Sequence, residues 1–144
     1  MIIKIDDEYK KNLNKKIATK LFKYILFEEN GKTFCLKKGK NKEKILLPDY
    51  IGVTENTYAI VEYLKGIKKC EVFVGYNKNT DNGILWNTKI RFNGVIYESG
   101  NTDNMNLSIV LATLKFLENE EVINKNKKEN NNLIFIKDEI KKKR

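Results

Sequence analysis

Residues 84–117 read ILWNTKIRFNGVIYESGNTDNMNLSIVLATLKFL, and this stretch decides the fold. It begins with a Trp-bearing β-type segment, and Asn93-Gly94 separates this segment from a second one, VIYES. Asn-Gly between two β-type segments is the strongest short signal for a hairpin with a two-residue turn. Such a hairpin predicts three facing pairs: Phe92 with Val95, Ile90 with Tyr97, and Arg91 with Ile96.

The second half of the stretch predicts an α-helix that packs on this hairpin. Thr102 or Asp103 can cap the helix, because their side-chain oxygens accept hydrogen bonds from its first free amides. Apolar residues then recur at the helical period: Leu107, Val110, Leu111, Leu114 and Leu117. We expect this apolar stripe to cover the sheet face that carries Trp86, Ile90 and Phe92.

A helix and a further hairpin are predicted near the start of the chain. Asp6 can cap a helix over residues 7–24, whose apolar side chains form one stripe at the helical period. The other face of this helix is rich in lysine, and we expect it to be solvated, although it could also meet phosphates. Asn30-Gly31 then predicts a turn between β-type segments at 25–28 and 33–37.

A second helix and another strand follow. Thr54 is expected to cap a helix that ends with Gly66 in the C′ position. Residues 68–75 alternate polar and apolar side chains, so they predict a strand with one buried face. Residues 77–83 are polar and predict a loop, in which a ligand contact could lie.

Together these elements predict an α+β fold, with an antiparallel β-sheet packed by two to three α-helices. The chain of 144 residues is long enough for one domain, placed at residues 1–118, and too short for two substantial ones. Residues 119–144 predict a polar linker and a Lys-rich tail, with a short apolar strand at 133–136. That strand is expected to join a sheet edge or to dock on another subunit, which favours a homo-oligomer.

The charge balance favours an anionic partner. The chain has 28 Lys and Arg against 19 Asp and Glu, which gives a formal net charge of +9. This excess suits a nucleic acid, a nucleotide or an acidic protein, although an AT-rich genome would also enrich lysine and asparagine. No apolar run is long enough to cross a bilayer and no signal peptide is apparent, so we expect a cytoplasmic protein with no membrane partner.

The sequence carries no recognisable catalytic or metal-binding motif. Histidine is absent, and Cys35 and Cys70 form no CxxC pair, so a closed zinc site would lack ligands. We expect the two cysteines to be small apolar residues of the core, although their spacing does not exclude a disulfide. We therefore predict a binding protein rather than an enzyme, with no cofactor and no metal.

Residues 76–104 collect the side chains that a nucleotide-type anion requires. Such a ligand needs aromatic rings for its base, cations for its phosphate and amides for its polar edges. The candidates are Tyr76, Trp86 and Tyr97 for stacking, Lys78, Lys89 and Arg91 for phosphate, and Asn87, Asn101 and Asn104 for hydrogen bonds. Core packing for Trp86 and Tyr97, and an ordinary surface position for Arg91, are the alternatives.

The order of these segments resembles the phage ABA sandwich domain family. The matching motifs lie between residues 13 and 117: Ile17-Ala18 with Tyr24, Pro48-Asp49-Tyr50 with Ile60-Val61-Glu62-Tyr63-Leu64, and Leu107-Ser108-Ile109 with Ala112 and Leu114. The family's Gly-Trp after the first helix is replaced here by Phe22-Lys23-Tyr24, and its Ser-Thr-Asp run by Ile51-Gly52-Val53. The resemblance implies a phage or prophage origin and names no reaction.

The layout is also similar to that of the Thoeris anti-defence sponges, which are small phage proteins that hold cyclic ADP-ribose-type signals. This similarity implies a non-catalytic counter-defence protein that sequesters a nucleotide immune signal, cyclic ADP-ribose-type or a cyclic oligonucleotide, in the bacterial host. The first alternative is an anti-CRISPR or another protein-directed inhibitor, with a host defence protein as its partner. The second alternative is a single-stranded nucleic-acid binder, which the positive net charge would suit.

Overall fold

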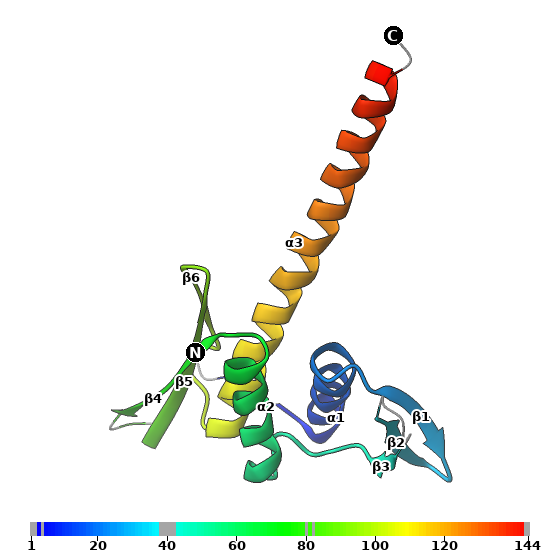
Figure 1. The fold of residues 1–144 in the computed structure, drawn as a ribbon. Coiled ribbons are helices and arrows are strands. Elements are labelled where there is room, and N and C mark those ends of the chain that lie inside the picture. The colour runs from blue at the N-terminus through cyan, green and yellow to red at the C-terminus, as the bar shows by residue number, and fades with distance from the viewer. Residues whose placement is uncertain (1–2, 4, 38–42, 80, 82, 143–144) are drawn as a thin grey trace.

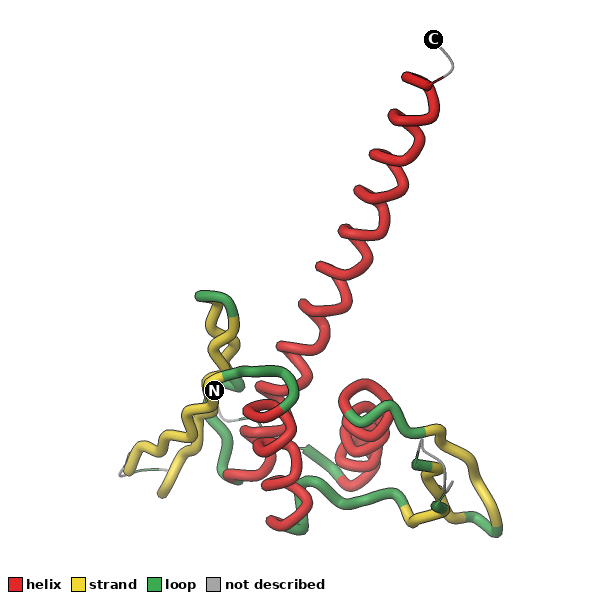
Figure 2. The backbone as a smooth tube through the Cα atoms, in the orientation of Figure 1, coloured by secondary structure: helices red, strands yellow, loops and turns green. Residues whose placement is uncertain are grey.

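The fold is α+β, as the sequence predicts, and its strands divide over two small antiparallel sheets. The computed structural model describes residues 3, 5–37, 43–79, 81 and 83–142 (Figures 1 and 2). The helical elements are α1 (Asp7–Lys16), the π-helical turn η1 (Ile17–Leu21), α2 (Thr54–Gly66) and α3 (Met105–Lys142). The strands are β1 (Ile25–Glu29), β2 (Lys32–Leu36), β3 (Lys44–Leu46), β4 (Glu71–Asn79), β5 (Gly83–Phe92) and β6 (Val95–Glu98). The two sheets have the orders β1-β2-β3 and β4-β5-β6.

Both Asn-Gly hairpins are confirmed. Asn30 and Gly31 have φ angles of 53° and 74°, and Asn93 and Gly94 have φ angles of 50° and 76°. Two successive residues with positive φ make the turn whose twist matches that of paired strands. Between β5 and β6 the register contains the three predicted pairs: Phe92 with Val95, Ile90 with Tyr97, and Arg91 with Ile96.

The first helix starts as predicted and ends earlier. The Asp6 carboxylate accepts a hydrogen bond of 2.8 Å from the Tyr9 amide, which confirms Asp6 as the N-cap. The α-helix gives way to the π-helical turn after Lys16, and helical structure ends at Leu21 rather than at Tyr24. Lys23 has a φ angle of 60°, so the chain has already left the helix when it turns into β1.

The second helix departs from the prediction at both ends. Thr54 is its first helical residue, not its cap, and the Thr54 hydroxyl accepts instead from the side-chain amide of Asn106 at 3.2 Å. Gly66 still belongs to the helix, and the positive φ angle expected there occurs at Lys69, with a value of 60°. A short non-helical link, residues 67–70, therefore joins α2 to β4.

The third helix is much longer than predicted. Its N-cap is Asn104, whose side-chain oxygen accepts from the Leu107 amide at 3.0 Å, and not Thr102 or Asp103. The helix runs on through Lys142, so the expected linker and the expected strand at 133–136 are both helical (Figure 1). After Gly100 the sequence contains neither glycine nor proline, so no residue breaks the helix.

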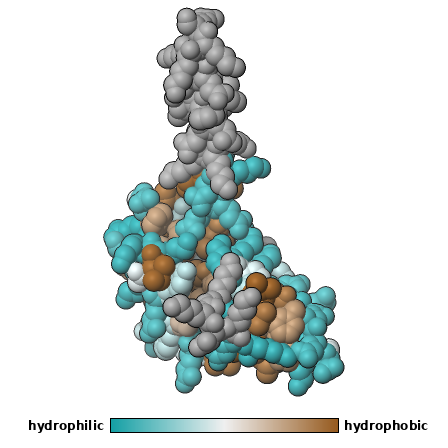
Figure 3. Space-filling model, turned by 45° about the vertical axis from the view of Figure 1, so that its right-hand side comes forward, coloured by the Kyte–Doolittle hydropathy of each residue, from teal (hydrophilic) through white to brown (hydrophobic). Residues whose placement is uncertain are grey.

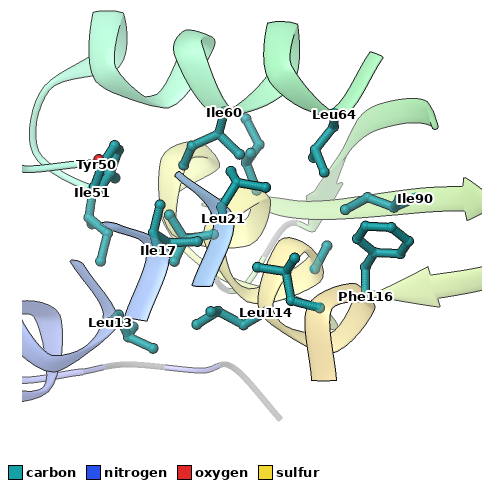
Figure 4. Packing of buried hydrophobic residues seen from close by; sticks show 14 of the residues in the cluster. Leu13, Ile17, Leu21, Tyr50, Ile51, Ile60, Leu64, Ile90, Leu114 and Phe116 are labelled. Atoms are coloured by element: carbon teal, nitrogen blue, oxygen red, sulfur yellow. The ribbon is translucent and has the colours of Figure 1, made fainter. Parts of the chain in front are cut away.

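The first turns of α3 lie at the centre of the core. One side of the helix meets β5, where the Thr88 and Ser108 hydroxyls form a buried hydrogen bond of 2.7 Å. The other side meets η1 and α2, and side chains from all these elements converge on it (Figure 4). The fully buried residues of α3 include Ile109, Val110, Ala112 and Thr113. Because both sides of α3 are covered, its buried surface is wider than the single stripe read from the sequence.

We predict that truncation of Phe116 destabilises the whole fold. Phe116 is 1% exposed, and its ring lies 5.4 Å from that of Phe92 and 5.6 Å from that of Tyr97. Phe116→Ala should lower the free energy of unfolding by about 3–5 kcal/mol, because it leaves a cavity in the core. Chemical denaturation followed by circular dichroism measures this change.

Val122→Ala is the matched control on the same helix. Val122 is 56% exposed, so its truncation should change the unfolding free energy by less than about 0.5 kcal/mol. A loss below about 1 kcal/mol for Phe116→Ala would mean that the Phe116 ring is not buried between α3 and the strands β5 and β6.

Candidate functional site

α3 covers one face of the sheet β4-β5-β6, and the other face carries exposed cations together with the buried side chain of Leu85. Even-numbered residues of β5 point toward α3, and Thr88 and Ile90 are fully buried there. Odd-numbered residues share the opposite face, because side chains alternate along a strand. Lys89 and Arg91 are exposed on that face. We call this second side, which carries the odd-numbered residues of β4 and β5, the open face.

The open face contains a hollow of about 420 Å³. Its lining comes from β4, from β5 and from the segment before α3: Phe73, Gly75, Tyr76, Asn77, Leu85, Asn87, Lys89 and Asn101. Three facing pairs of the β4–β5 ladder build it: Phe73 with Lys89, Gly75 with Asn87, and Asn77 with Leu85. The hollow therefore combines apolar surface, amide groups and one cation.

Gly75 creates the space in the middle of the hollow. It has no side chain to cover Asn87, its partner across the ladder. A Cβ atom at Gly75 would lie 3.7 Å from the Asn87 carbonyl oxygen, which is an ordinary contact, and the φ angle of Gly75 is not positive. A larger residue would fit there without backbone strain and would fill the hollow.

Asn87 is held in place by Ser99. The Ser99 hydroxyl lies 3.1 Å from the Asn87 side-chain oxygen and 2.8 Å from the Gly100 carbonyl oxygen, and it accepts a hydrogen bond of 3.0 Å from the Thr88 amide. Within the described part of the chain, the Asn87 side-chain nitrogen donates to no other group. A fixed amide with a free donor can bind a carbonyl, a ring nitrogen or a phosphate oxygen.

The two cations of the open face are both paired with carboxylates. Lys89 lies 3.2 Å from Glu98, its neighbour on β6, and both side chains are about half exposed. Arg91 pairs with Glu71, and its guanidinium lies 5.7 Å from the centre of the Phe73 ring. Exposed pairs of this kind contribute about 0–1 kcal/mol, so an anionic ligand can replace Glu98 as the partner of Lys89.

The structure brings together four of the nine predicted site residues. Tyr76, Asn87, Lys89 and Asn101 line the hollow, although Tyr76 is an even-numbered residue whose ring lies beside that of Trp86. Arg91 shares the open face but does not line the hollow. The remaining predictions, for Lys78, Trp86, Tyr97 and Asn104, fall on residues that serve other surfaces or the core.

The four predicted residues that lie away from the open face contact other parts of the protein. Trp86 and Lys78 lie on the α3 side of the sheet, and the Trp86 ring is 5.5 Å from that of Tyr76. Tyr97 packs on Phe116 and its hydroxyl accepts from the Asn119 amide, as the core-packing alternative predicts. Asn104 caps α3. No single ligand in the hollow could meet all nine predicted residues.

Sequence reasoning missed four lining residues: Phe73, Gly75, Asn77 and Leu85. Asn77 was missed because residues 77–83 predict a loop, whereas β4 continues to Asn79 and pairs with Gly83. The pairing of β4 with β5 is the signal that could have revealed them. Pairing Tyr76 with Trp86 would have placed Gly75 beside Asn87.

Lysines of α1 and η1 form a different basic surface. Lys15 lies 3.7 Å from Glu28 and Lys20 lies 3.6 Å from Glu121, so part of its charge is balanced. A second hollow of about 390 Å³ beside this helix is lined by lysines and also by Asp7 and Asp49. In the view of Figure 3 the molecular surface is mainly hydrophilic, with separate apolar patches. The solvated-face interpretation of the lysines fits these contacts better than a phosphate site does.

The two cysteines of the chain lie in the core. Cys35 and Cys70 are free and buried, and burial raises the pKa of both thiols. The pKa of Cys70 rises to about 11, mainly through burial and then through Glu120, with Lys68 opposing the rise. Both thiols are protonated at neutral pH, so neither is a ready nucleophile. Across the described ranges, no three acidic or cysteine residues gather as metal ligands, and no helix is long and apolar enough to cross a membrane.

Comparison with protein-family models, with curated proteins and with solved structures found no match to this chain. The resemblance to the phage ABA sandwich family stays a prediction.

We predict that Asn104 is a structural cap and that Asn101 is not. Asn104→Ala removes the side-chain oxygen that accepts from Leu107, so it should lower the unfolding free energy by about 1 kcal/mol. Asn101→Ala is the matched control, because Asn101 is exposed and its side chain bonds to no described residue. Equal losses for both variants in thermal or chemical denaturation would contradict the cap.

Proposed function

We propose that this protein is a non-catalytic binding protein that holds a nucleotide-type anion in the hollow of the open face. The observation that carries the proposal is the gap at Gly75, opposite a fixed Asn87 amide and beside Lys89. The lining supplies each kind of contact that such a ligand uses.

An aromatic side chain, an amide and a cation recognise different parts of a nucleotide. The half-exposed ring of Phe73 offers an apolar platform for a base. Asn77, Asn87 and Asn101 offer donors and acceptors for the polar edges of base and sugar. Lys89 offers a charge for phosphate, and the net charge of +9 attracts anions over a longer range.

The size of the hollow agrees with a small molecule. Ligand sites usually have volumes of about 300–1,000 Å³, and this hollow of about 420 Å³ lies in the lower part of that range. A mononucleotide or one half of a dinucleotide signal suits such a space. A long single strand would need a groove continuing past the hollow, with several stacking rings.

The biological role that we propose is sequestration of a nucleotide immune signal in a bacterial host. It rests on the resemblance to phage counter-defence proteins and on the absence of any recognisable catalytic motif in the sequence. A protein-directed inhibitor is the alternative. The nucleotide proposal is favoured because the hollow is concave and mixes amides with one cation, whereas protein-binding surfaces are usually broad.

The direct test uses calorimetric titration with a panel of mononucleotides, ADP-ribose, cyclic ADP-ribose and cyclic dinucleotides. We expect at least one of them to bind. Lys89→Ala should then weaken binding about tenfold, because it removes one charged hydrogen bond worth about 1.5 kcal/mol. Gly75→Leu should weaken it by about 100-fold or more, because leucine occupies the ligand's space.

Lys78→Ala is the matched control for charge. It removes the same unit charge from the opposite side of the sheet, so affinity should change less than about twofold at physiological salt. If Lys78→Ala and Lys89→Ala weaken binding equally, the attraction is a general charge effect and the hollow is not the site. If no nucleotide binds, and none is released from the protein after incubation with bacterial lysate, the proposal is wrong.

A further inference from the structure

Strand β4 is a long, unprotected edge of the sheet. It has nine residues, and among the described residues the strand order β4-β5-β6 leaves one of its sides without a neighbouring strand (Figure 1). Natural edge strands are usually short, or are interrupted by proline, a bulge or an inward-pointing charge. Between Val72 and Asn77, β4 contains no charged residue and no proline.

The ladder shows which backbone groups of β4 face outward. The amide and carbonyl of Trp86 both bond to Thr102, at 2.7 and 2.9 Å, and the Thr88 carbonyl accepts from Ser99 at 3.0 Å. Even-numbered residues of β5 therefore direct their backbone groups away from β4, and odd-numbered residues direct theirs toward it. Across the ladder these backbone groups bond to the odd-numbered residues of β4. The backbone amides and carbonyls of the even-numbered residues of β4 therefore point outward, away from β5. These residues are Val72, Val74, Tyr76 and Lys78.

The side chains of this edge are exposed on both faces of the sheet. Phe73 is 50% exposed on the open face, while Val74 and Tyr76 are 38% and 62% exposed on the other. Within the described part of the chain, no other segment bonds to the outward backbone groups of β4. An added strand pairs with a sheet edge through unpaired backbone amides and carbonyls, and it packs on apolar side chains on either face of the sheet.

We propose that β4 pairs in antiparallel fashion with β4 of a second copy of this chain, which joins the two sheets into one sheet of six strands. The pairing is symmetric about a two-fold axis, as in most homodimers. It does not depend on what the hollow binds.

Complete overlap of the two strands fixes the register. Gly75 then lies on the two-fold axis and faces Gly75 of the second copy, while Val74 faces Tyr76 and Val72 faces Lys78. The even-numbered pairs carry the new hydrogen bonds, because these residues direct their backbone groups outward. The Gly75 pair is of the closer, non-hydrogen-bonded kind, with Cα atoms about 4.5 Å apart.

Charge favours a second copy in this orientation. The acidic residue Glu71 begins β4 and the basic residue Lys78 lies near its end. In-register parallel pairing would place Glu71 beside Glu71 and Lys78 beside Lys78, each pair on one face of the sheet, which is unfavourable for like charges. Antiparallel pairing instead puts the two Glu71 side chains, and the two Lys78 side chains, at opposite ends of the paired strands. The charges of β4 therefore favour the antiparallel direction.

The pairing also completes the hollow. Phe73, Gly75 and Asn77 lie on the edge strand, so each hollow is open toward the two-fold axis. In the paired state Asn77 of the second copy lies opposite Phe73, and the two hollows adjoin across the glycines. Each copy thereby supplies an amide and a ring to the site of the other.

A cysteine placed on the two-fold axis tests the register without any ligand. Gly75→Cys should form a disulfide-linked dimer under mild oxidation, because facing residues at this kind of pair have the spacing that a disulfide needs. Lys78→Cys is the matched control on the same strand, since the two copies of residue 78 would lie roughly 20 Å apart. The buried Cys35 and Cys70 do not compete. Non-reducing electrophoresis measures the dimer fraction, and we expect it to be at least tenfold larger for Gly75→Cys.

A proline at Val74 tests the hydrogen bonds themselves. It removes an outward amide and leaves the β4–β5 ladder intact, so the variant should stay folded and become monomeric. Ile96→Pro is the matched control, because it removes an outward amide from the other edge of the sheet, on β6, and should remain dimeric. Light scattering after size exclusion gives the mass, and circular dichroism verifies folding.

Three results would overturn the proposal. The unmodified protein could be monomeric at about 100 µM, Gly75→Cys could cross-link no faster than Lys78→Cys, or Val74→Pro could remain dimeric. A monomer that binds a nucleotide would leave the proposed function intact and refute only the pairing. A β4 edge occupied by a strand of another protein would give a monomer in pure solution and would equally refute it.

Discussion

The packing of α3 on one face of the sheet β4-β5-β6 is the constraint on which the rest of the structure depends. The Thr88–Ser108 hydrogen bond and the contacts of Phe116 fix the helix against β5 and β6. The same turns of α3 hold η1 and α2 on their other side. Because α3 covers the even-numbered face, the hollow that we propose as the ligand site lies on the odd-numbered face. The division into a structural face and an open face follows from this one docking.

The local signals predicted the elements well. Asn93-Gly94 fixes a turn with two positive φ angles, and the register of β5 with β6 follows from it alone. The length of α3 was not predictable from local polarity, because a polar Asn- and Lys-rich segment suits a linker as well as an exposed helix. The division into two sheets was also not predictable from the sequence, because it depends on contacts between residues distant in sequence and not on strand propensity.

The candidate site was predicted only in part, for a physical reason. Alternation along β5 separates Asn87 and Lys89 from Trp86, and the structure keeps that separation. The sequence does not reveal which residues of a neighbouring strand stand opposite, so Phe73 and Gly75 could not be paired with Lys89 and Asn87. Nor does it reveal that Glu71 and Glu98 neutralise the cations of this face. Register and charge pairing are properties of the assembled sheet.

The central claim is that the ligand meets the open face and not the lysines of α1. Side-chain amide signals of asparagine in two-dimensional NMR spectra test it most directly during titration with the tightest-binding nucleotide of the panel. The signals of Asn77, Asn87 and Asn101 should shift, while those of Asn119 and Asn124 on α3 should stay unchanged. Shifts confined to the backbone amides around Lys10 and Lys11, with the three asparagines unmoved, would contradict it.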